Sequence, residues 1–111
     1  MAFAIESLPR DGRVVVGVHG DVDIASAAEL REHLQGAVER YDTVVVDLAG
    51  VGFMDSTGLG VLVASHNRAK ASGRLLVVAQ PQRLVRNALR LVQVDSVIDV
   101  YDTVDEALTA G

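Results

Sequence analysis

The sequence from position 44 to position 60 reads Val44-Val45-Val46-Asp47-Leu48-Ala49-Gly50-Val51-Gly52-Phe53-Met54-Asp55-Ser56-Thr57-Gly58-Leu59-Gly60. An almost uninterrupted apolar run leads into a loop punctuated by glycines, and an amphipathic segment begins directly after the loop. This order predicts a strand that is buried on both faces, followed by a helix. It places the Ser56 hydroxyl at the start of that helix, beside the Asp55 carboxylate.

Upstream of this stretch, the sequence predicts two strands and a helix. Residues 3–5 predict an antiparallel edge strand, and residues 13–19, which are rich in β-branched side chains, predict the strand beside it. Apolar residues between 27 and 41 recur three and four positions apart, which predicts an amphipathic helix of about 15 residues. Ser26, with Glu29 three positions later, predicts a capping box at the start of this helix.

Downstream, two further strands and two further helices are predicted. The second helix should end near Ser72-Gly73, because glycine suits the residue after a helix. Residues 74–79 and 97–100 predict strands, and Pro81 fits the first turn of the third helix. The predicted inward side chains of the third helix are Leu84, Val85, Ala88 and Leu91, and those of the last helix, capped by Asp102 or Thr103, are Val104, Ala107 and Leu108.

This alternation predicts an α/β domain with a mainly parallel central β-sheet, an N-terminal antiparallel strand or hairpin, and about four packed helices. The whole chain, 1–111, is predicted to form one domain, because its length suits one and no proline- or serine-rich linker divides it. Folds of this class place their sites beyond the carboxyl ends of strands. The loops that carry Asp23 and Ser56 both follow strands, so we expect them to lie near each other.

The composition excludes several classes of function. The chain has no cysteine, so it cannot form a disulfide or a cysteine-based zinc site. Its net charge of −5 disfavours general nucleic-acid binding, which depends on neutralising phosphates. No segment approaches the roughly 20 apolar residues of a membrane span, and the N-terminus lacks the pattern of a secretion signal. These features are compatible with a cytoplasmic protein that binds neither nucleic acid nor membrane.

The Ser56 hydroxyl has two alternative roles at the start of a helix. It can cap the helix by accepting a hydrogen bond from a free amide, which is worth about 1 kcal/mol. It can also carry a phosphate, because free amides and the helix dipole stabilise an anion there. Phosphorylation would add about −1.5 to −2 charges beside Asp55 and would repel a partner that docks on the neutral loop.

Two further candidate residues are carboxylates: Asp55 in this loop and Asp23 in the turn before the first helix. Asp55 is predicted to be a capping or turn carboxylate, with a base toward the serine or a metal holder as the alternative. Asp23 lies just upstream of the first helix, whose start Ser26 already explains. Asp23 is therefore predicted to be free to face a partner.

The sequence lacks the usual enzyme motifs. No lysine follows the glycines as a phosphate-binding P-loop requires, and Met54 stands where a nucleophile elbow needs its first glycine. His19, His33 and His66 show no metal-ligand spacing. An enzyme with Ser56 as nucleophile would need a general base that the sequence does not supply. We therefore expect no enzyme activity, no metal and no cofactor.

Residues 53–60 resemble the loop of the anti-sigma factor antagonists, which belong to the STAS domain family. Gly20-Asp21-Val22-Asp23 is similar to the family's glycine-x-hydrophobic-aspartate turn before the first helix, and Val45-Val46-Asp47-Leu48 is similar to its strand before the loop. The resemblance covers nearly the whole chain in the same order. It implies a small STAS-like domain.

The resemblance implies a function called partner switching. The unphosphorylated antagonist binds an anti-sigma factor that is also a serine kinase, and this binding releases a sigma factor. The kinase phosphorylates the loop serine, the complex separates, and a metal-dependent serine phosphatase restores the first state. The chain would then be a bacterial cytoplasmic regulator of transcription in a stress response or sporulation, and a monomer or weak homodimer.

Carried over residue by residue, the resemblance assigns the site. Ser56 matches the phosphoacceptor, and Thr57 is a candidate secondary acceptor. The residues implied to contact the partner are Asp23, Asp55, Ser56, Thr57, Gly58 and Gly60. The alternative is a non-catalytic STAS scaffold or adaptor subunit of a sensory assembly or transporter.

Overall fold

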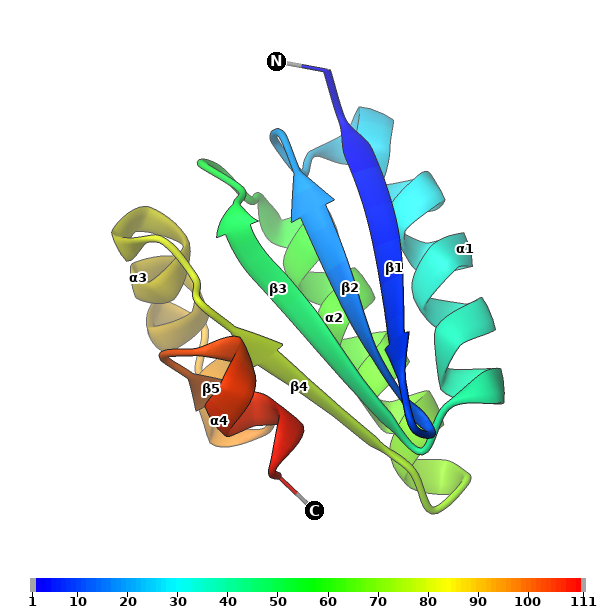
Figure 1. The fold of residues 1–111 in the computed structure, drawn as a ribbon. Coiled ribbons are helices and arrows are strands. Elements are labelled where there is room, and N and C mark those ends of the chain that lie inside the picture. Colours follow the sequence, from blue (N-terminus) through cyan, green and yellow to red (C-terminus); the bar gives the residue numbers. More distant parts are fainter. Residues whose placement is uncertain (1, 111) are drawn as a thin grey trace.

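The structure is a computed structural model, and it describes residues 2–110 (Figure 1). Within this range the strands form one mixed sheet in which β1 is antiparallel to β2 and the other neighbours are parallel. This confirms the predicted α/β fold with an antiparallel strand at its N-terminal edge. The strands, in both chain order and spatial order, are β1 (Ala4–Arg10), β2 (Arg13–His19), β3 (Thr43–Gly50), β4 (Leu75–Ala79) and β5 (Val100–Tyr101).

Helices cover both faces of the sheet, but unequally. The larger core lies between the sheet and the first three helices, and it includes Val14, Val46 and Leu76 from alternate strand positions. On the other face the short α4 packs on β3, β4 and β5 over Val45 and Val77. The helical segments are α1 (Ile24–Arg40), α2 (Ser56–Ala71), α3 (Arg83–Leu91), the 3-10 turn η1 (Val94–Ser96) and α4 (Val104–Leu108).

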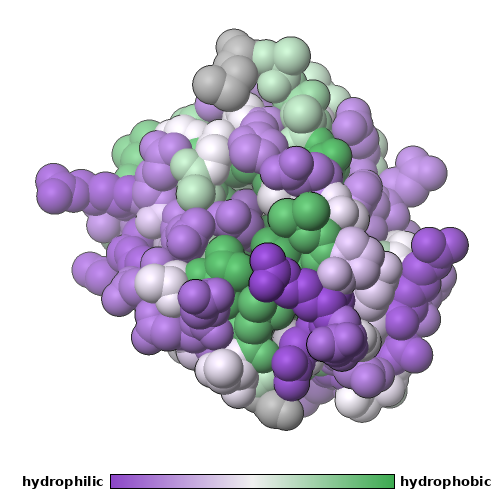
Figure 2. Space-filling view, in the orientation of Figure 1, coloured by the Kyte–Doolittle hydropathy of each residue, from purple (hydrophilic) through white to green (hydrophobic). Residues whose placement is uncertain are grey.

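The two faces of the sheet are visible in the figures. Figure 1 shows α1 and α2 behind the sheet and α4 in front of it. In the same orientation, Figure 2 shows apolar side chains in green at the centre of the front face, surrounded by polar ones. No helix between residues 2 and 110 is both long and apolar enough to cross a membrane.

The central strand follows its sequence pattern closely. Val44, Val45 and Val46 are fully buried, as expected for a strand covered on both faces. The helix that follows the loop ends as predicted, with Ser72 as its C-cap. Gly73 then has a φ of 70°, a left-handed conformation that glycine adopts without a steric cost.

The C-terminal third departs from the prediction. Helix α3 begins at Arg83, so Pro81 precedes the helix instead of lying in its first turn. Val85 and Leu89 are buried as the inward stripe, whereas Leu84 and Leu91 are 60% and 83% exposed. The prediction for those two leucines was wrong, because they lie on the side of α3 that turns away from the sheet.

The last strand and helix are shifted in a similar way. Strand β5 covers only Val100–Tyr101, because the residues before it form the turn η1 and Ile98 is fully buried after that turn. Thr103 caps α4 by accepting a hydrogen bond from the Glu106 amide at 3.1 Å. Ala107 is buried as predicted, and the flanking apolar residues of α4 are partly buried.

Two loops are joined at the carboxyl ends of β2 and β3. Val22 forms a parallel bridge with Met54, in which the Val22 amide donates to the Phe53 carbonyl at 2.9 Å. The Asp55 amide donates to the Val22 carbonyl at 3.0 Å. These bonds continue the β2–β3 pairing beyond the strands and set the starts of α1 and α2 side by side. This confirms that the loops of Asp23 and Ser56 lie near each other.

Glycine is required at one position in the first turns of α2. A Cβ at Gly58 would lie 2.6 Å from Val22 Cγ1 and 2.7 Å from Met54 Cγ, and Val22 is fully buried. The glycine therefore lets the helix start pack directly on the joined loops. Gly60 is exposed, and none of the described atoms lies within 4 Å of a Cβ built there.

These two glycines predict opposite effects of alanine. Gly58→Ala should lower the free energy of unfolding by about 1–3 kcal/mol, because the added methyl group overpacks the contact with Val22. Gly60→Ala should raise it by roughly 0.5–1 kcal/mol, because it removes backbone entropy from the unfolded chain without a clash. Urea unfolding of both variants measures the difference. A Gly58→Ala protein as stable as the Gly60→Ala protein would contradict the packing described for Val22.

Candidate functional site at the start of helix α2

Ser56 is the first residue of α2, and its side chain is exposed. Its hydroxyl forms no hydrogen bond with any residue from 2 to 110, although its neighbours Asp55 and Thr57 are bonded to each other. The loop therefore presents an unengaged hydroxyl at the positive end of a helix.

Asp55, and not Ser56, caps helix α2. The Asp55 Oδ1 atom accepts hydrogen bonds from the amides of Thr57 at 2.9 Å and Gly58 at 3.3 Å. The alternative in which Ser56 is the cap was wrong, because a carboxylate one residue earlier reaches the same amides. The prediction that Asp55 is a capping carboxylate is confirmed.

The Thr57 side chain reinforces this cap. Its hydroxyl donates to Asp55 Oδ1 at 2.5 Å, and the side chain is half-buried. This bond, aided by the amides of Gly58 and Thr57 and opposed by burial, holds the pKa of Asp55 below its ordinary value. Asp55 is therefore ionised and directed at the helix start, rather than placed as a base toward Ser56.

Asp23 has the equivalent position at the start of α1. Its Oδ1 atom accepts from the amides of Ala25 at 2.9 Å and Ser26 at 3.3 Å, and the Ser26 hydroxyl accepts from the Asp23 amide at 3.0 Å. The predicted box of Ser26 and Glu29 was wrong, because the helix begins at Ile24, three residues earlier than that box requires. Asp23 thus has the capping role that the sequence assigned to Ser26.

Apolar side chains are exposed around these two helix starts. Ile24, the first residue of α1, is 80% exposed, and Phe53 is 44% exposed in the loop before α2. Ser56 lies at one end of a groove of about 460 Å³ between α2 and the residues that follow α3. The groove is otherwise mainly apolar, with Leu59, Gly60, Val63, Ala64, Asn67, Val92 and Val94 as its lining.

The groove was not found by sequence reasoning. One signal was present in the sequence, since Ser56, Gly60 and Ala64 are small residues four positions apart and so share one side of the helix. The opposite wall consists of Val92 and Val94, whose approach to α2 depends on the tertiary fold.

The histidines have partners away from Ser56. His19 is bonded to Glu6, His33 to Ser7, and the His66 Nδ1 atom lies 3.4 Å from the Leu76 carbonyl. Within the part of the chain that the structure describes, no cluster of three or more His, Asp or Glu side chains is arranged to hold a metal ion. The geometry of the described site is that of a recognition surface with one accessible hydroxyl.

The division of roles between Asp55 and Ser56 predicts unequal effects on stability. Asp55→Ala should shift the urea midpoint to lower concentration, because two helix amides lose their acceptor. Ser56→Ala should stay within about 0.5 kcal/mol of the wild type, because its hydroxyl is unengaged. A loss for Ser56→Ala equal to that for Asp55→Ala would restore Ser56 as the cap.

The hydrogen bond from the Thr57 hydroxyl predicts that substitutions of Thr57 change the pKa of Asp55. Thr57→Val should raise the pKa of Asp55 toward its ordinary value, whereas Thr57→Ser should keep it low; carboxyl carbon shifts in an NMR titration measure both. Asp55 has a lower pKa in the folded protein than in the unfolded chain, so its ionised form stabilises the fold. This stabilisation is fully present above the unfolded pKa and is lost as the pH falls through the folded pKa. The difference in free energy of unfolding between the wild type and Thr57→Val should therefore shrink as the pH falls through that range. An unchanged Asp55 pKa in Thr57→Val would show that the backbone amides alone depress it.

Comparison with known proteins identifies the family. Residues 4–107 match the STAS domain model. The chain is 31% identical over 100 residues to the anti-sigma-F factor antagonist RsfB of Mycobacterium tuberculosis, covering 89% of this chain and 81% of RsfB. It is 29% identical over 102 residues to the anti-sigma-B factor antagonist of Bacillus subtilis, covering 92% of this chain and 91% of the relative.

A solved structure agrees with the sequence relatives. The crystal structure of an anti-sigma factor antagonist from Mycobacterium paratuberculosis superimposes with a TM-score of 0.90 at 28% identity, over 97% of this chain and 92% of the other. The family model, the relatives and the fold lead to one conclusion: the chain belongs to the STAS domain family, and within it to the anti-sigma factor antagonists.

Proposed function

We propose that this protein acts by partner switching, with Ser56 as its phosphoacceptor. The observation that carries the proposal is the division of roles at the start of α2: Asp55 caps the helix, and the exposed Ser56 hydroxyl remains unengaged. A kinase can therefore modify Ser56 without removing a hydrogen bond from the fold. The partner is an anti-sigma factor with serine kinase activity, whose binding in the unphosphorylated state releases a sigma factor.

The site accommodates a phosphate yet changes what the surface can bind. The positive end of the α2 dipole favours the added anion, although Asp55 already accepts hydrogen bonds from the amides of Thr57 and Gly58. Phosphorylation brings about −1.5 to −2 charges next to the ionised Asp55. The exposed Ile24 and Phe53 and the apolar groove beside Ser56 supply a surface suited to a protein partner. A dianion at the edge of that surface would have to lose its hydration in the complex, which opposes binding.

The residues around Ser56 contribute in different ways. Thr57 is a poorer acceptor of phosphate than Ser56, because it is half-buried and its hydroxyl already donates to Asp55. Gly58 is buried, so its part is to bring α2 against Val22, whereas the exposed Gly60 leaves room for a partner in the groove. Asp23 uses Oδ1 for its cap, which leaves its second oxygen for the partner.

The remaining parts of the cycle follow from the same proposal. A metal-dependent serine phosphatase restores the unmodified protein, and the chain itself performs no catalysis. The cycle operates in the bacterial cytoplasm, where the sigma factor acts.

Paired baits test this proposal. The full chain, unmodified or carrying phosphoserine at position 56, is used to capture proteins from an extract of the source organism, and mass spectrometry identifies what each bait retains. An anti-sigma factor with a serine kinase fold, held by the unmodified bait alone, is the expected result. Retention of the same partners by both baits would overturn the switch and favour a scaffold or adaptor role.

Substitutions at the acceptor predict the direction of the switch. With the captured kinase and ATP, the wild type and Thr57→Ala should incorporate phosphate, whereas Ser56→Ala should not and should stay bound. Ser56→Asp should bind at least about tenfold more weakly, because it adds a carboxylate that would have to lose its hydration at the edge of the docking surface. Isothermal titration measures the affinities. Phosphate incorporation by Ser56→Ala but not by Thr57→Ala would move the acceptor to Thr57.

A further inference from the structure

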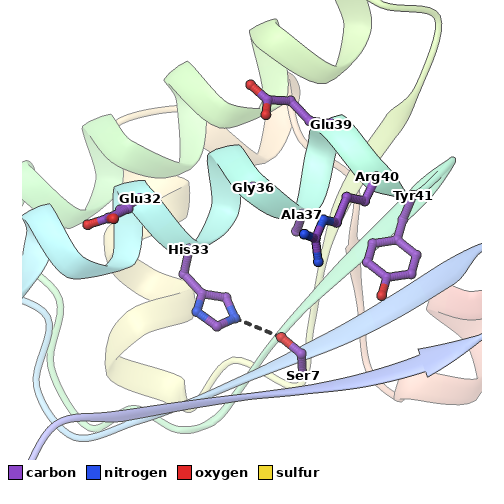
Figure 3. Close-up of a pocket in the computed structure, with 8 residues that line it drawn as sticks. All are labelled: Ser7, Glu32, His33, Gly36, Ala37, Glu39, Arg40 and Tyr41. Carbon is purple, nitrogen blue, oxygen red and sulfur yellow. Dashed lines mark hydrogen bonds between the residues drawn. The ribbon is translucent and has the colours of Figure 1, made fainter.

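A second polar site lies between α1 and the edge strand β1. Residues from the last turns of α1 and from the middle of β1 surround a depression of about 400 Å³ (Figure 3). None of the residues assigned to the Ser56 site lines it. This depression therefore needs an explanation that is independent of partner switching.

Four hydrogen-bonding side chains gather on one side of α1 here. The Ser7 hydroxyl on β1 lies 2.7 Å from the His33 Nε2 atom. Figure 3 shows that Arg40 and Tyr41, at the end of α1, extend toward the same strand as His33 does. Within the Ser7–His33 pair one group donates to the other, so the donors left for a ligand are the Arg40 guanidinium, the Tyr41 hydroxyl and the remaining hydrogen of that pair.

The acidic residues of the depression are turned away from these donors. In Figure 3, the Glu39 carboxylate extends from the side of α1 away from β1, and the Glu32 carboxylate extends sideways from the helix. The Glu39 carboxylate accepts a hydrogen bond from Arg68 on α2, so its charge is already matched. Arg40 is therefore the charged side chain of the lining that extends toward β1, in a chain with a net charge of −5.

A glycine inside α1 keeps the depression open. Gly36 lies three residues after His33 and four residues before Arg40, so the three share one side of the helix. Glycine in a helix interior costs roughly 0.5–1 kcal/mol relative to alanine. No described atom lies within 4 Å of a Cβ built at Gly36, so packing does not require a glycine there. A larger side chain at this position would occupy the space in front of the donors.

We propose that this depression binds the anionic oxygen group, phosphate or carboxylate, of a small molecule. Arg40 provides a planar fork that pairs with two oxygens of such a group. Tyr41 and the Ser7–His33 pair supply further donors around it. The open space at Gly36 admits the body of the ligand. The Ser7–His33 bond alone would only tether β1 to α1, and it would need neither Arg40 nor Gly36.

NMR titration of the 15N-labelled full chain tests the proposal. Sodium phosphate and sodium succinate are added separately at constant ionic strength, with sodium chloride as the reference salt. The amides of Ser7, His33, Gly36, Arg40 and Tyr41 should shift along saturable curves with at least one of the two anions. Saturation with phosphate alone would identify a phosphorylated ligand, and saturation with succinate alone would identify a carboxylate. Absence of saturation with both would overturn the proposal.

Three variants connect the binding to the side chains. Arg40→Gln should weaken it by about tenfold or more, because a charge-assisted bidentate pair is lost. Arg31→Gln is the matched control, since Arg31 is exposed on the same helix outside the depression, and it should bind as the wild type does. Gly36→Leu should abolish binding while amides remote from the site keep their positions. Equal affinities of Arg40→Gln and Arg31→Gln, or full affinity in Gly36→Leu, would show that the anions bind elsewhere.

Discussion

The joining of Val22 to the loop before α2 is the constraint on which the rest of the site depends. Two backbone hydrogen bonds link Val22 to Phe53 and Asp55, and they extend the pairing of β2 and β3 past the ends of both strands. Because each loop leads directly into a helix, this link fixes the starts of α1 and α2 relative to each other. Gly58 completes the arrangement by letting α2 pack on Val22 without an intervening side chain. The accessible hydroxyl of Ser56 is therefore held by the sheet rather than by a free loop.

Both helices begin with the same kind of cap, an aspartate side chain, but the consequences for the neighbouring serine differ. Each begins with an aspartate whose Oδ1 atom accepts from two amides, at Asp23 for α1 and at Asp55 for α2. In α1 the nearby serine, Ser26, completes the cap and is buried. In α2 the serine directly follows the aspartate, so it stays outside the cap and exposed. The spacing from aspartate to serine, three residues in α1 and one in α2, separates a structural hydroxyl from an accessible one.

The sequence predicted those parts of the structure that local pattern determines. The valine run at 44–46 fixed the central strand, since so apolar a segment is stable only when both faces are covered. Caps were harder to predict, because aspartate and serine compete for the same amides and the helix start decides between them. The exposure of Leu84 and Leu91 depends on where α3 lies on the sheet. The spacing of apolar residues within α3 does not determine that placement. The groove beside Ser56 and the depression at Gly36 are both formed by segments distant in sequence, so only the folded chain shows them.

The independence of the fold from the Ser56 hydroxyl has an evolutionary consequence. A hydroxyl that supports no hydrogen bond in the described structure is invisible to selection for stability. Quality control that removes unfolded chains would not recognise a copy in which this serine has been replaced by another small residue. Such a copy would fold, persist at a normal level and compete for the same partners. The regulatory role of residue 56 can therefore be lost by drift or gained by a single substitution, while the scaffold around it remains unchanged.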